Sequence, residues 1–368
     1  MTAARNLKCP SCGGELVFDP STQQYACPYC GSHFDQRQLD EILKEEQQPS
    51  QDPEAAAFDE ENSFADARQQ EEAPQDGGQE AVVYRCPSCG AEILTDETTA
   101  ATFCCFCHNP VILEGRISGK FLPDRVIPFT ISRQEAVEKF LAAMKKKWFV
   151  RKGFFQKDQI EKLTGVYLPC WDADWEGDAA LTADATRVRV WRSGDTEFTE
   201  TRFYRVIREG HLRFKGLTKN ALKKADQELA EGVHPYRQQE KKPFSIGYLS
   251  GFQAERRDVE WEEVQPQMQS EARTYTERLL QESIQGYATV TGQRMQFGPE
   301  KMKREYLMVP VWMVTYRGKD RKMYYYAMNG QTGEVCGRLP VDYKKLGLVS
   351  ALLAAAVFAL MLLGGYLL

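Results

Sequence analysis

Hydrophobic residues are distributed unevenly along the chain, and the longest apolar stretch lies at its end. Residues 346–368 are 23 positions without a charged side chain. As a helix rising ~1.5 Å per residue they would extend about 34 Å, enough to cross a bilayer. A core helix of a soluble protein is apolar on one side, whereas this stretch is apolar on every side. Tyr343, Lys344 and Lys345 precede it as an aromatic and basic interfacial anchor. The pattern predicts a single C-terminal transmembrane helix over residues 343–368.

Periodic patterns upstream predict an α+β domain over residues 119–342. A capping-box sequence from Ser132 to Glu135 precedes apolar residues at three- and four-residue steps, which predicts a helix of about four turns. Its inward face would consist of Ala136, Val137, Phe140, Leu141, Met144 and Trp148. Two further helices are predicted over residues 220–231 and 259–285, with Pro266 as a break or kink. Strands are predicted over residues 166–171, 187–191, 203–214, 288–297, 306–316, 322–328 and 334–339.

Two short segments of this domain are similar to each other. Leu168-Pro169-Cys170-Trp171 matches Val309-Pro310-Val311-Trp312, and strand-forming residues flank both. Because proline has no amide donor, both segments suit a strand edge or a bulge. The domain is therefore either one unit or two related halves. Its aromatic residues favour a packed core, with a stacking platform for bases as the alternative.

Residues 36–81 have a different composition from the rest of the chain. Between Asp40 and Glu80, fourteen acidic residues stand against Lys44 and Arg68, a net charge of −12. Residues 38–48 are compatible with a short helix, but the remainder lacks a sustained apolar stripe. We predict an acidic disordered linker that acts as a solvated spacer, with an acidic interaction tail as the alternative.

Eight cysteines near the start of the chain form an internal repeat. Each set contains two Cys-x-x-Cys pairs separated by fourteen residues, and each cysteine of the second set lies 77 positions after its counterpart. Four thiolates at this spacing are the tetrahedral ligand set of a structural Zn²⁺. We predict two structural Zn²⁺ ions on β-hairpin knuckles, in a first zinc ribbon over residues 1–35 and a second over residues 82–118. The predicted metal ligands are Cys9, Cys12, Cys27, Cys30, Cys86, Cys89, Cys104 and Cys107.

Neighbouring residues refine the zinc hypothesis. Glycine follows three of the second cysteines, a position that suits a positive φ, and His108 takes the fourth such position. Neither His108, His33 nor the additional Cys105 is needed as a ligand. Residues 1–8 are polar and lead directly into the first pair, which argues against a secreted disulfide framework, and no βαβ context supports a thioredoxin-like site.

The same residues argue against catalysis. A site with four thiolates has no open position for a substrate or an activated water. The Gly115–Lys120 segment is one residue too short for a phosphate loop, and the serine in Gly247–Gly251 is misplaced for a nucleophile elbow. His211 and His234 are solitary in the sequence, and Asp172 and Asp174 have no identifiable partner. We expect no enzyme, no catalytic residue and no cofactor besides two structural Zn²⁺.

Charge separates the remaining function classes. The formal net charge is −5, and eight thiolates with two Zn²⁺ would bring it to about −9. Residues 5–34 are neutral overall and residues 85–114 carry −3, so the ribbons lack the lysine and arginine that phosphate contacts require. Nucleic-acid binding of the transcription or replication type is the alternative that this charge disfavours. Reduced cysteines indicate a reducing compartment.

Several motifs occur together in one order: the two ribbons, Ile127-Pro128-Phe129 before a capped helix, residues 166–171, residues 329–333 and the C-terminal apolar helix. In this combination the chain resembles the bacterial transcription factor IIB-type zinc-ribbon membrane proteins encoded beside flotillin-like (SPFH) and phage-shock-protein-A-like partners. The resemblance implies a non-enzymatic adaptor that recruits a protein partner in envelope stress. The second ribbon and the long linker depart from that pattern.

The basic residues before the apolar helix place the N-terminal domains in the cytoplasm, on a single-pass protein of the cell membrane. We therefore expect the zinc ribbons to be displayed on a flexible arm.

Overall fold

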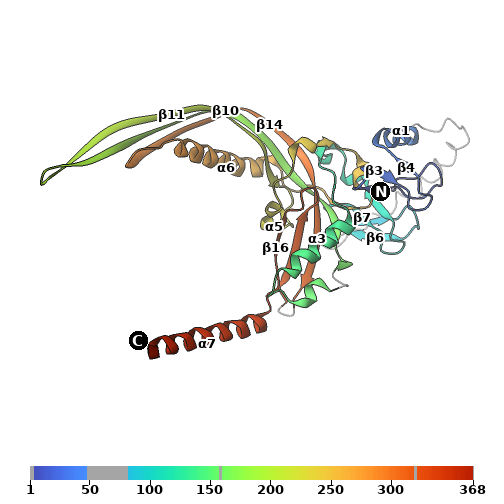
Figure 1. The fold of residues 1–368 in the computed structure, drawn as a ribbon. Coiled ribbons are helices and arrows are strands. Elements are labelled where there is room, and N and C mark those ends of the chain that lie inside the picture. Colours follow the sequence, from blue (N-terminus) through green and yellow to red (C-terminus); the bar gives the residue numbers. More distant parts are fainter. Residues whose placement is uncertain (1–3, 48–81, 157–159, 319–320, 368) are drawn as a thin grey trace, which may run out of the picture.

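The computed structural model describes residues 4–47, 82–156, 160–318 and 321–367. Its body is a mixed sheet of eleven strands, from which a long arm and a separate C-terminal helix extend (Figure 1). The strands of this sheet are β1 (Ala4–Arg5), β7 (Thr99–Phe103), β8 (Pro110–Leu113), β9 (Arg125–Val126), β10 (Thr164–Ser193), β11 (Thr196–Asn220), β12 (Lys242–Pro243), β13 (Gln253–Glu255), β14 (Thr289–Arg317), β15 (Met323–Asn329) and β16 (Val335–Arg338). Their main order is β1-β8-β7-β13-β10-β14-β15-β16, with β11 beside β10 and with β9 between β12 and β14.

Two smaller sheets and five α-helices complete the described structure. One small sheet contains β2 (Val17–Asp19), β3 (Gln24–Ala26) and β4 (His33–Phe34), and the other contains β5 (Val82–Arg85) and β6 (Glu92–Thr95). The helices are α1 (Gln36–Gln47), α3 (Arg133–Lys145), α5 (Gln227–Gly232), α6 (Trp261–Glu282) and α7 (Tyr343–Leu367). The predicted linker therefore begins with helix α1, and its residues 48–81 lie outside the described residues.

The two proline segments that are similar in sequence lie opposite each other in the long central strands β10 and β14. These strands are antiparallel, with Leu168 opposite Val309. On its other side, β10 pairs with β13 at Tyr167 and with β11 only from Cys170 onward. Pro169 thus lies where the neighbouring strand changes, so the sheet accommodates a residue without an amide donor. The prediction that this proline lies at a sheet edge or a bulge was wrong. Pro169 lies within the central strand β10, at the point where pairing with β13 has ended and pairing with β11 has not yet begun.

Strand β14 repeats this arrangement. It pairs with β9 at Met308 and with β15 from Val311 onward, and Pro310 lies where one neighbouring strand replaces the other. The elements before each long strand also correspond. A short strand, β9 or β13, is followed by a helix with a capping box, α3 or α6. In both cases the residue at the N-cap follows the paired strand residue by six positions, Ser132 after Val126 and Glu260 after Ala254. Each short strand pairs with the long strand of the other half, which interlocks the two halves.

The helices differ from the predictions mainly at their ends. Helix α3 begins at the predicted capping box and buries Ala136, Phe140 and Met144, but it ends before Trp148, which is 80% exposed. The predicted helix over residues 220–231 is reduced to α5, because Asn220 bonds the backbone of Leu222 in a turn and the helix begins only after its N-cap, Asp226. Helix α6 continues through Pro266 without a break.

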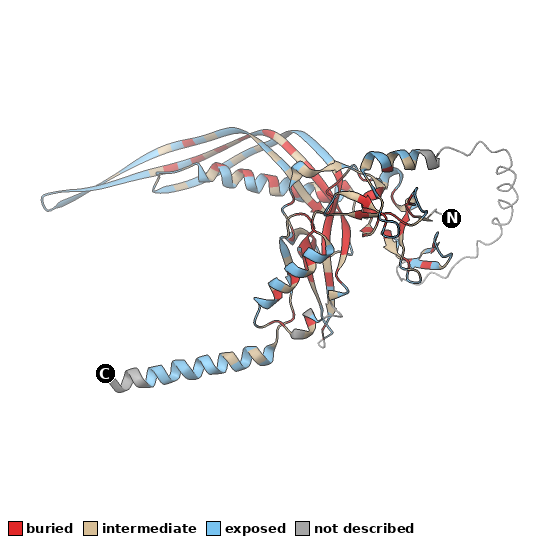
Figure 2. Cartoon of the chain, turned by 45° about the vertical axis from the view of Figure 1, so that its right-hand side comes forward, coloured by how far each residue is buried: buried red, intermediate tan, exposed pale blue. Residues whose placement is uncertain are grey.

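Strands β10, β11 and β14 continue far beyond the body as an arm, and α6 lies along one of its faces (Figure 2). A small apolar cluster of Ala179, Leu181 and Leu280 packs the helix against the strands. Beyond this cluster most side chains of the arm are exposed. Helix α7 leaves the body after Asp342, and its segment Tyr343–Leu362 is long and apolar enough to cross a membrane.

Candidate metal centres

The first four cysteines converge on one point. Their sulfur atoms all lie within 4.8 Å of one another. The Sγ–Sγ distance is 3.7 Å between Cys9 and Cys30 and 3.5 Å between Cys12 and Cys27. A tetrahedral Zn²⁺ with bonds of ~2.3 Å holds its sulfurs about 3.8 Å apart. The separations therefore fit one zinc ion bound by four thiolates.

The second four cysteines have the same geometry. Their sulfurs also lie within 4.8 Å of one another, with Sγ–Sγ distances of 3.7 Å for Cys86–Cys107 and for Cys89–Cys104. The chain thus has two four-cysteine groups that could each bind a zinc ion, as the cofactor prediction stated. Four thiolates close each site, so zinc would stabilise the fold there and would not present a position for a substrate. Cys105 is exposed and belongs to neither group.

Each cysteine pair is shaped by the same backbone turn. In the first knuckle the amide of Gly13 donates to the carbonyl of Cys9 over 2.8 Å, and the other three knuckles repeat this bond at 2.9 Å. The residue after the second cysteine has a positive φ, as predicted for the glycines: 72° at Gly13, 74° at Gly31, 74° at Gly90 and 60° at His108. This turn brings two sulfurs to the same side of the backbone, which explains why the sequence spacing is sufficient to place them.

The two ribbons differ in how the rest of the chain holds them. In the first ribbon, strands β2, β3 and β4 form a sheet of their own. In the second, one knuckle joins β5 to β6 and the other joins β7 to β8, which belong to the large sheet. Strand β1, which precedes the first knuckle, pairs with β8. The second site therefore lies next to the large sheet, and residues at the start of the first ribbon extend that sheet.

A buried carboxylate links the two ribbons. Glu15 of the first ribbon is 6% exposed and accepts hydrogen bonds from Ser88 Oγ over 2.7 Å and from Asn109 Nδ2 over 2.8 Å. Ser88 lies within one knuckle of the second ribbon, and Asn109 follows the other. Sequence reasoning missed these three residues, because no spacing rule connects polar residues 73 and 94 positions apart.

The first ribbon is also packed against the sheet domain. Phe18 and Tyr25 are buried against Tyr248. The amide of Phe18 donates to the carbonyl of Ser250, whose hydroxyl donates to the carbonyl of Leu16. A Cβ on Gly247 would lie 2.4 Å from a Leu39 methyl group, so the backbone approaches helix α1 very closely there. The hypothesis that both ribbons are displayed on a flexible arm was wrong, since interlocking side chains hold them on the body.

The aspartates considered for acid–base chemistry have structural partners. Asp172 is buried, and Lys241 Nζ lies 2.5 Å from its Oδ2. Burial raises the pKa of Asp172 to about 6, and it outweighs the opposing effect of the Lys241 charge. Asp174 accepts a hydrogen bond from the amide of Gly216 over 2.9 Å. Both side chains therefore have partners within the fold, at the junction between body and arm.

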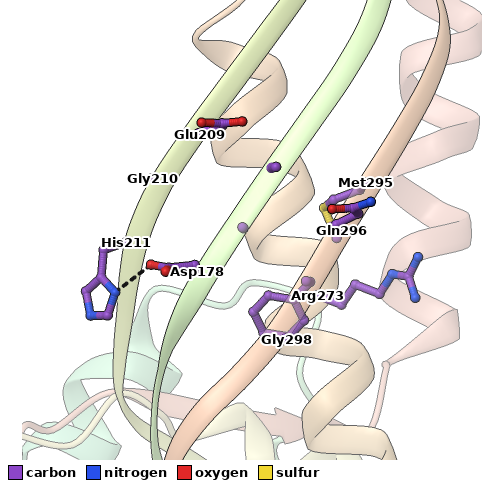
Figure 3. Close-up of a pocket in the computed structure, with 11 residues that line it drawn as sticks. Asp178, Glu209, Gly210, His211, Arg273, Met295, Gln296 and Gly298 are labelled. Atoms are coloured by element: carbon purple, nitrogen blue, oxygen red, sulfur yellow. Dashed lines mark hydrogen bonds and ion pairs between the residues drawn. The ribbon is translucent and has the colours of Figure 1, made fainter.

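The histidines and remaining cysteines also have local roles. His211 is not solitary: its ring nitrogens lie 2.8 Å from Asp178 Oδ1 and 3.1 Å from Glu176 Oε1, beside an open hollow of about 1030 Å³ on the arm (Figure 3). Hydrogen bonds that the ring donates to Asp178 and Glu176 raise the pKa of His211. His234 Nδ1 lies 2.8 Å from Thr218 Oγ1. Cys170 is fully buried, whereas Cys336 is partly exposed.

Comparisons with known proteins identify the first ribbon and one relative of similar length. A family described as TFIIB zinc-binding matches residues 7–47, which include the first ribbon and α1. No solved structure matches the chain significantly. The chain is 32% identical over 367 residues to "Uncharacterized protein YdjG" of Bacillus subtilis (strain 168), an alignment that covers 98% of this chain and 99% of that protein. Because the similarity includes both ribbons, the sheet domain and the C-terminal helix, this chain belongs to the same family as YdjG of Bacillus subtilis.

Proposed function

We propose that this chain is a non-enzymatic adaptor that α7 anchors in the cell membrane and that holds a protein partner at the cytoplasmic face. The observation that carries the proposal is α7 itself. It is apolar along Tyr343–Leu362, and none of that segment is buried against the described part of the chain. Such a helix has no favourable environment in water but is stable in a bilayer. Lys344 and Lys345 at its start favour a cytoplasmic body.

The chemistry of the body supports an adaptor over an enzyme. Both metal groups consist of four thiolates, which leaves no coordination position for a reaction. Asp172 lies in an ion-pair network with Lys241 and Glu305. His211, on the arm, faces two carboxylates in an exposed setting. Among the described residues, neither Asp172 nor His211 forms a hydrogen bond with a serine, threonine or cysteine side chain.

The second ribbon offers a surface for a protein partner. Val83 and Leu94 are opposite each other on β5 and β6, and they are 56% and 69% exposed. Their neighbours Tyr84 and Ile93 are buried on the other face of the same hairpin. An apolar cross-strand pair on the outer face of a small sheet is typical of a contact with another protein. The resemblance to bacterial zinc-ribbon membrane proteins suggests a flotillin-like (SPFH) or phage-shock-protein-A-like partner and a role in envelope stress.

Cross-linking followed by purification from membranes tests this proposal. The full-length chain should capture a specific membrane-associated protein, and Leu94→Asp should reduce its recovery about tenfold if the β5–β6 face is the contact. Leu122→Asp, at another apolar position that is 53% exposed, is the matched control and should leave recovery unchanged. Equal recovery with both variants would remove the β5–β6 face from the proposal. Nanomolar, sequence-dependent retention of DNA or RNA at physiological salt would favour the nucleic-acid alternative over the adaptor.

A further inference from the structure

The outer end of the arm is a two-stranded hairpin without a covering element. Strand β14 pairs with β10 only as far as Thr289, opposite Thr186. Beyond this point residues 187–193 and 196–202 pair only with each other, over a length of about 23 Å at ~3.3 Å per residue. Helix α6 ends at Glu282 and its C-cap, Ser283. Because isolated two-stranded hairpins are marginally stable in water, a surface that covers this hairpin would stabilise it.

The two faces of the hairpin differ in charge. Leu181 packs against Leu280 of α6, and side chains alternate along a strand, so Arg187, Arg189 and Trp191 lie on the α6 side. Their cross-strand partners on this face are Arg202, Glu200 and Phe198, and Arg208 contacts the C-cap carbonyl of α6. We call this set the basic aromatic face; it carries four arginines and one glutamate, and because Glu200 pairs with Arg202 at 2.8 Å, three arginines are in excess.

The opposite face of the hairpin is electrically balanced. It exposes Val188, Val190, Phe203 and Ile207. Its two arginines have carboxylate partners, because Arg192 pairs with Glu197 at 3.0 Å and Arg205 with Asp184 at 3.6 Å. The excess positive charge is therefore confined to one side of the hairpin.

Aromatic rings hold two arginines of the basic aromatic face in place. The Arg187 guanidinium lies 5.4 Å from the ring centre of Tyr204 and 4.8 Å from that of Tyr287. The Arg189 guanidinium lies 5.6 Å from the ring centre of Trp191, which stacks on Phe198 at 5.5 Å. Neither arginine forms an ion pair with another of the described residues, so both can bind phosphate groups without first breaking one.

We propose that the basic aromatic face binds the anionic headgroup layer of the membrane in which α7 is anchored. Arginines attract anionic lipid headgroups, while tryptophan and tyrosine favour the boundary between water and hydrocarbon. The proposed anchoring supports this partner, because α7 would hold the body and its arm close to a bilayer. The inference rests on the proposed membrane anchoring.

Trypsin accessibility of the full-length protein in vesicles tests the proposal, since the basic aromatic face itself provides the cleavage sites. The chain is reconstituted into phosphatidylcholine vesicles with or without phosphatidylglycerol, and cleavage after Arg187 and Arg208 is followed by mass spectrometry. Cleavage should be about thirtyfold slower in the anionic vesicles, and salt should abolish the difference. The double variant R189Q/R202Q should lose most of this protection. R192Q/R205Q, which removes the same charge from the opposite face, is the matched control and should retain it.

The outcomes separate this inference from the proposed function. Resistance of the chain to extraction from the vesicles at alkaline pH reports whether α7 is inserted. If the chain is inserted and cleavage is equally fast in both kinds of vesicle, the hairpin does not bind lipid headgroups, although the anchor remains. If the chain is not inserted, the proposed anchoring fails. Equal loss of protection in the two double variants, or protection by a single-stranded oligonucleotide in place of anionic lipid, would also overturn the inference.

Discussion

Glu15 is a charged residue buried between the two zinc ribbons, where Ser88 and Asn109 donate hydrogen bonds to it. Hydrogen bonds to a buried carboxylate are stronger than those between neutral groups, and deleting the carboxylate removes both of them. We expect Glu15→Ala to lower the free energy of unfolding by about 2 kcal/mol, measured by denaturant titration of the zinc-loaded protein. Glu92→Ala, at an exposed position of β6, should change it by less than ~0.5 kcal/mol. Similar effects of both substitutions would show that Glu15 does not connect the ribbons.

Asp172 should give the folded protein a recognisable pH dependence. Burial raises its pKa from an ordinary value near 3.8 to about 6. Between these two values the folded state binds a proton that the unfolded state has released. The stabilisation is therefore complete below about pH 4 and is lost as the pH rises through about 6, a change on the order of 3 kcal/mol. Denaturant midpoints measured across this range should fall less steeply in Asp172→Asn than in the unmodified protein. A curve for Asp172→Asn that coincides with the original would assign the slope to other groups.

At the scale of elements, the four knuckles predict two zinc ions per chain. Metal analysis of the purified protein should give close to two equivalents, because each set of four sulfurs closes one tetrahedral site. Replacing Cys86 and Cys89 by serine should remove one equivalent and leave the other. It should also destabilise the sheet, since the affected knuckles connect β5 to β6 and hold the end of the β7–β8 hairpin. A single equivalent in the unmodified protein, or visible absorbance from iron, would contradict two zinc ribbons.

The knuckles also explain which parts of the structure the sequence could predict. Cys-x-x-Cys spacing and the Ser132 capping box are local, so neighbouring residues alone determine the sulfur positions and the start of α3. The pairing of β13 with β10 and of β9 with β14 connects residues far apart in the chain, and no local pattern specifies it. The similarity of the Pro169 and Pro310 segments was visible in the sequence. Their position at the two points where the neighbouring strand changes could not be inferred, because it depends on which strands pair in the folded sheet.

At the scale of the whole molecule, the body and both ribbons form one interlocked unit, while the arm and helix α7, the proposed anchor, extend from it. Polar and apolar contacts of Tyr25, Leu39 and Glu15 connect the first ribbon with elements more than 70 positions away. The sequence predicted separate ribbons on a tether because the acidic composition of residues 36–81 gives no sign of these contacts. A partner bound to the ribbons would therefore be held in a fixed orientation to the sheet domain.

Removing the anchor tests whether location and binding belong to different parts of the chain. Deleting residues 346–368 should release the protein from membranes without unfolding it, because none of the apolar segment is buried against the described body. The shortened protein should retain two zinc equivalents and an unchanged denaturant midpoint, and it should still bind its partner in solution. In cells, a fluorescently tagged partner should leave the membrane when the shortened chain replaces the full-length one. Neutralising Lys344 and Lys345 in the full-length chain is the matched comparison: it should weaken the orientation preference and retain insertion. If the partner stays at the membrane in cells that contain only the shortened chain, another protein anchors it there.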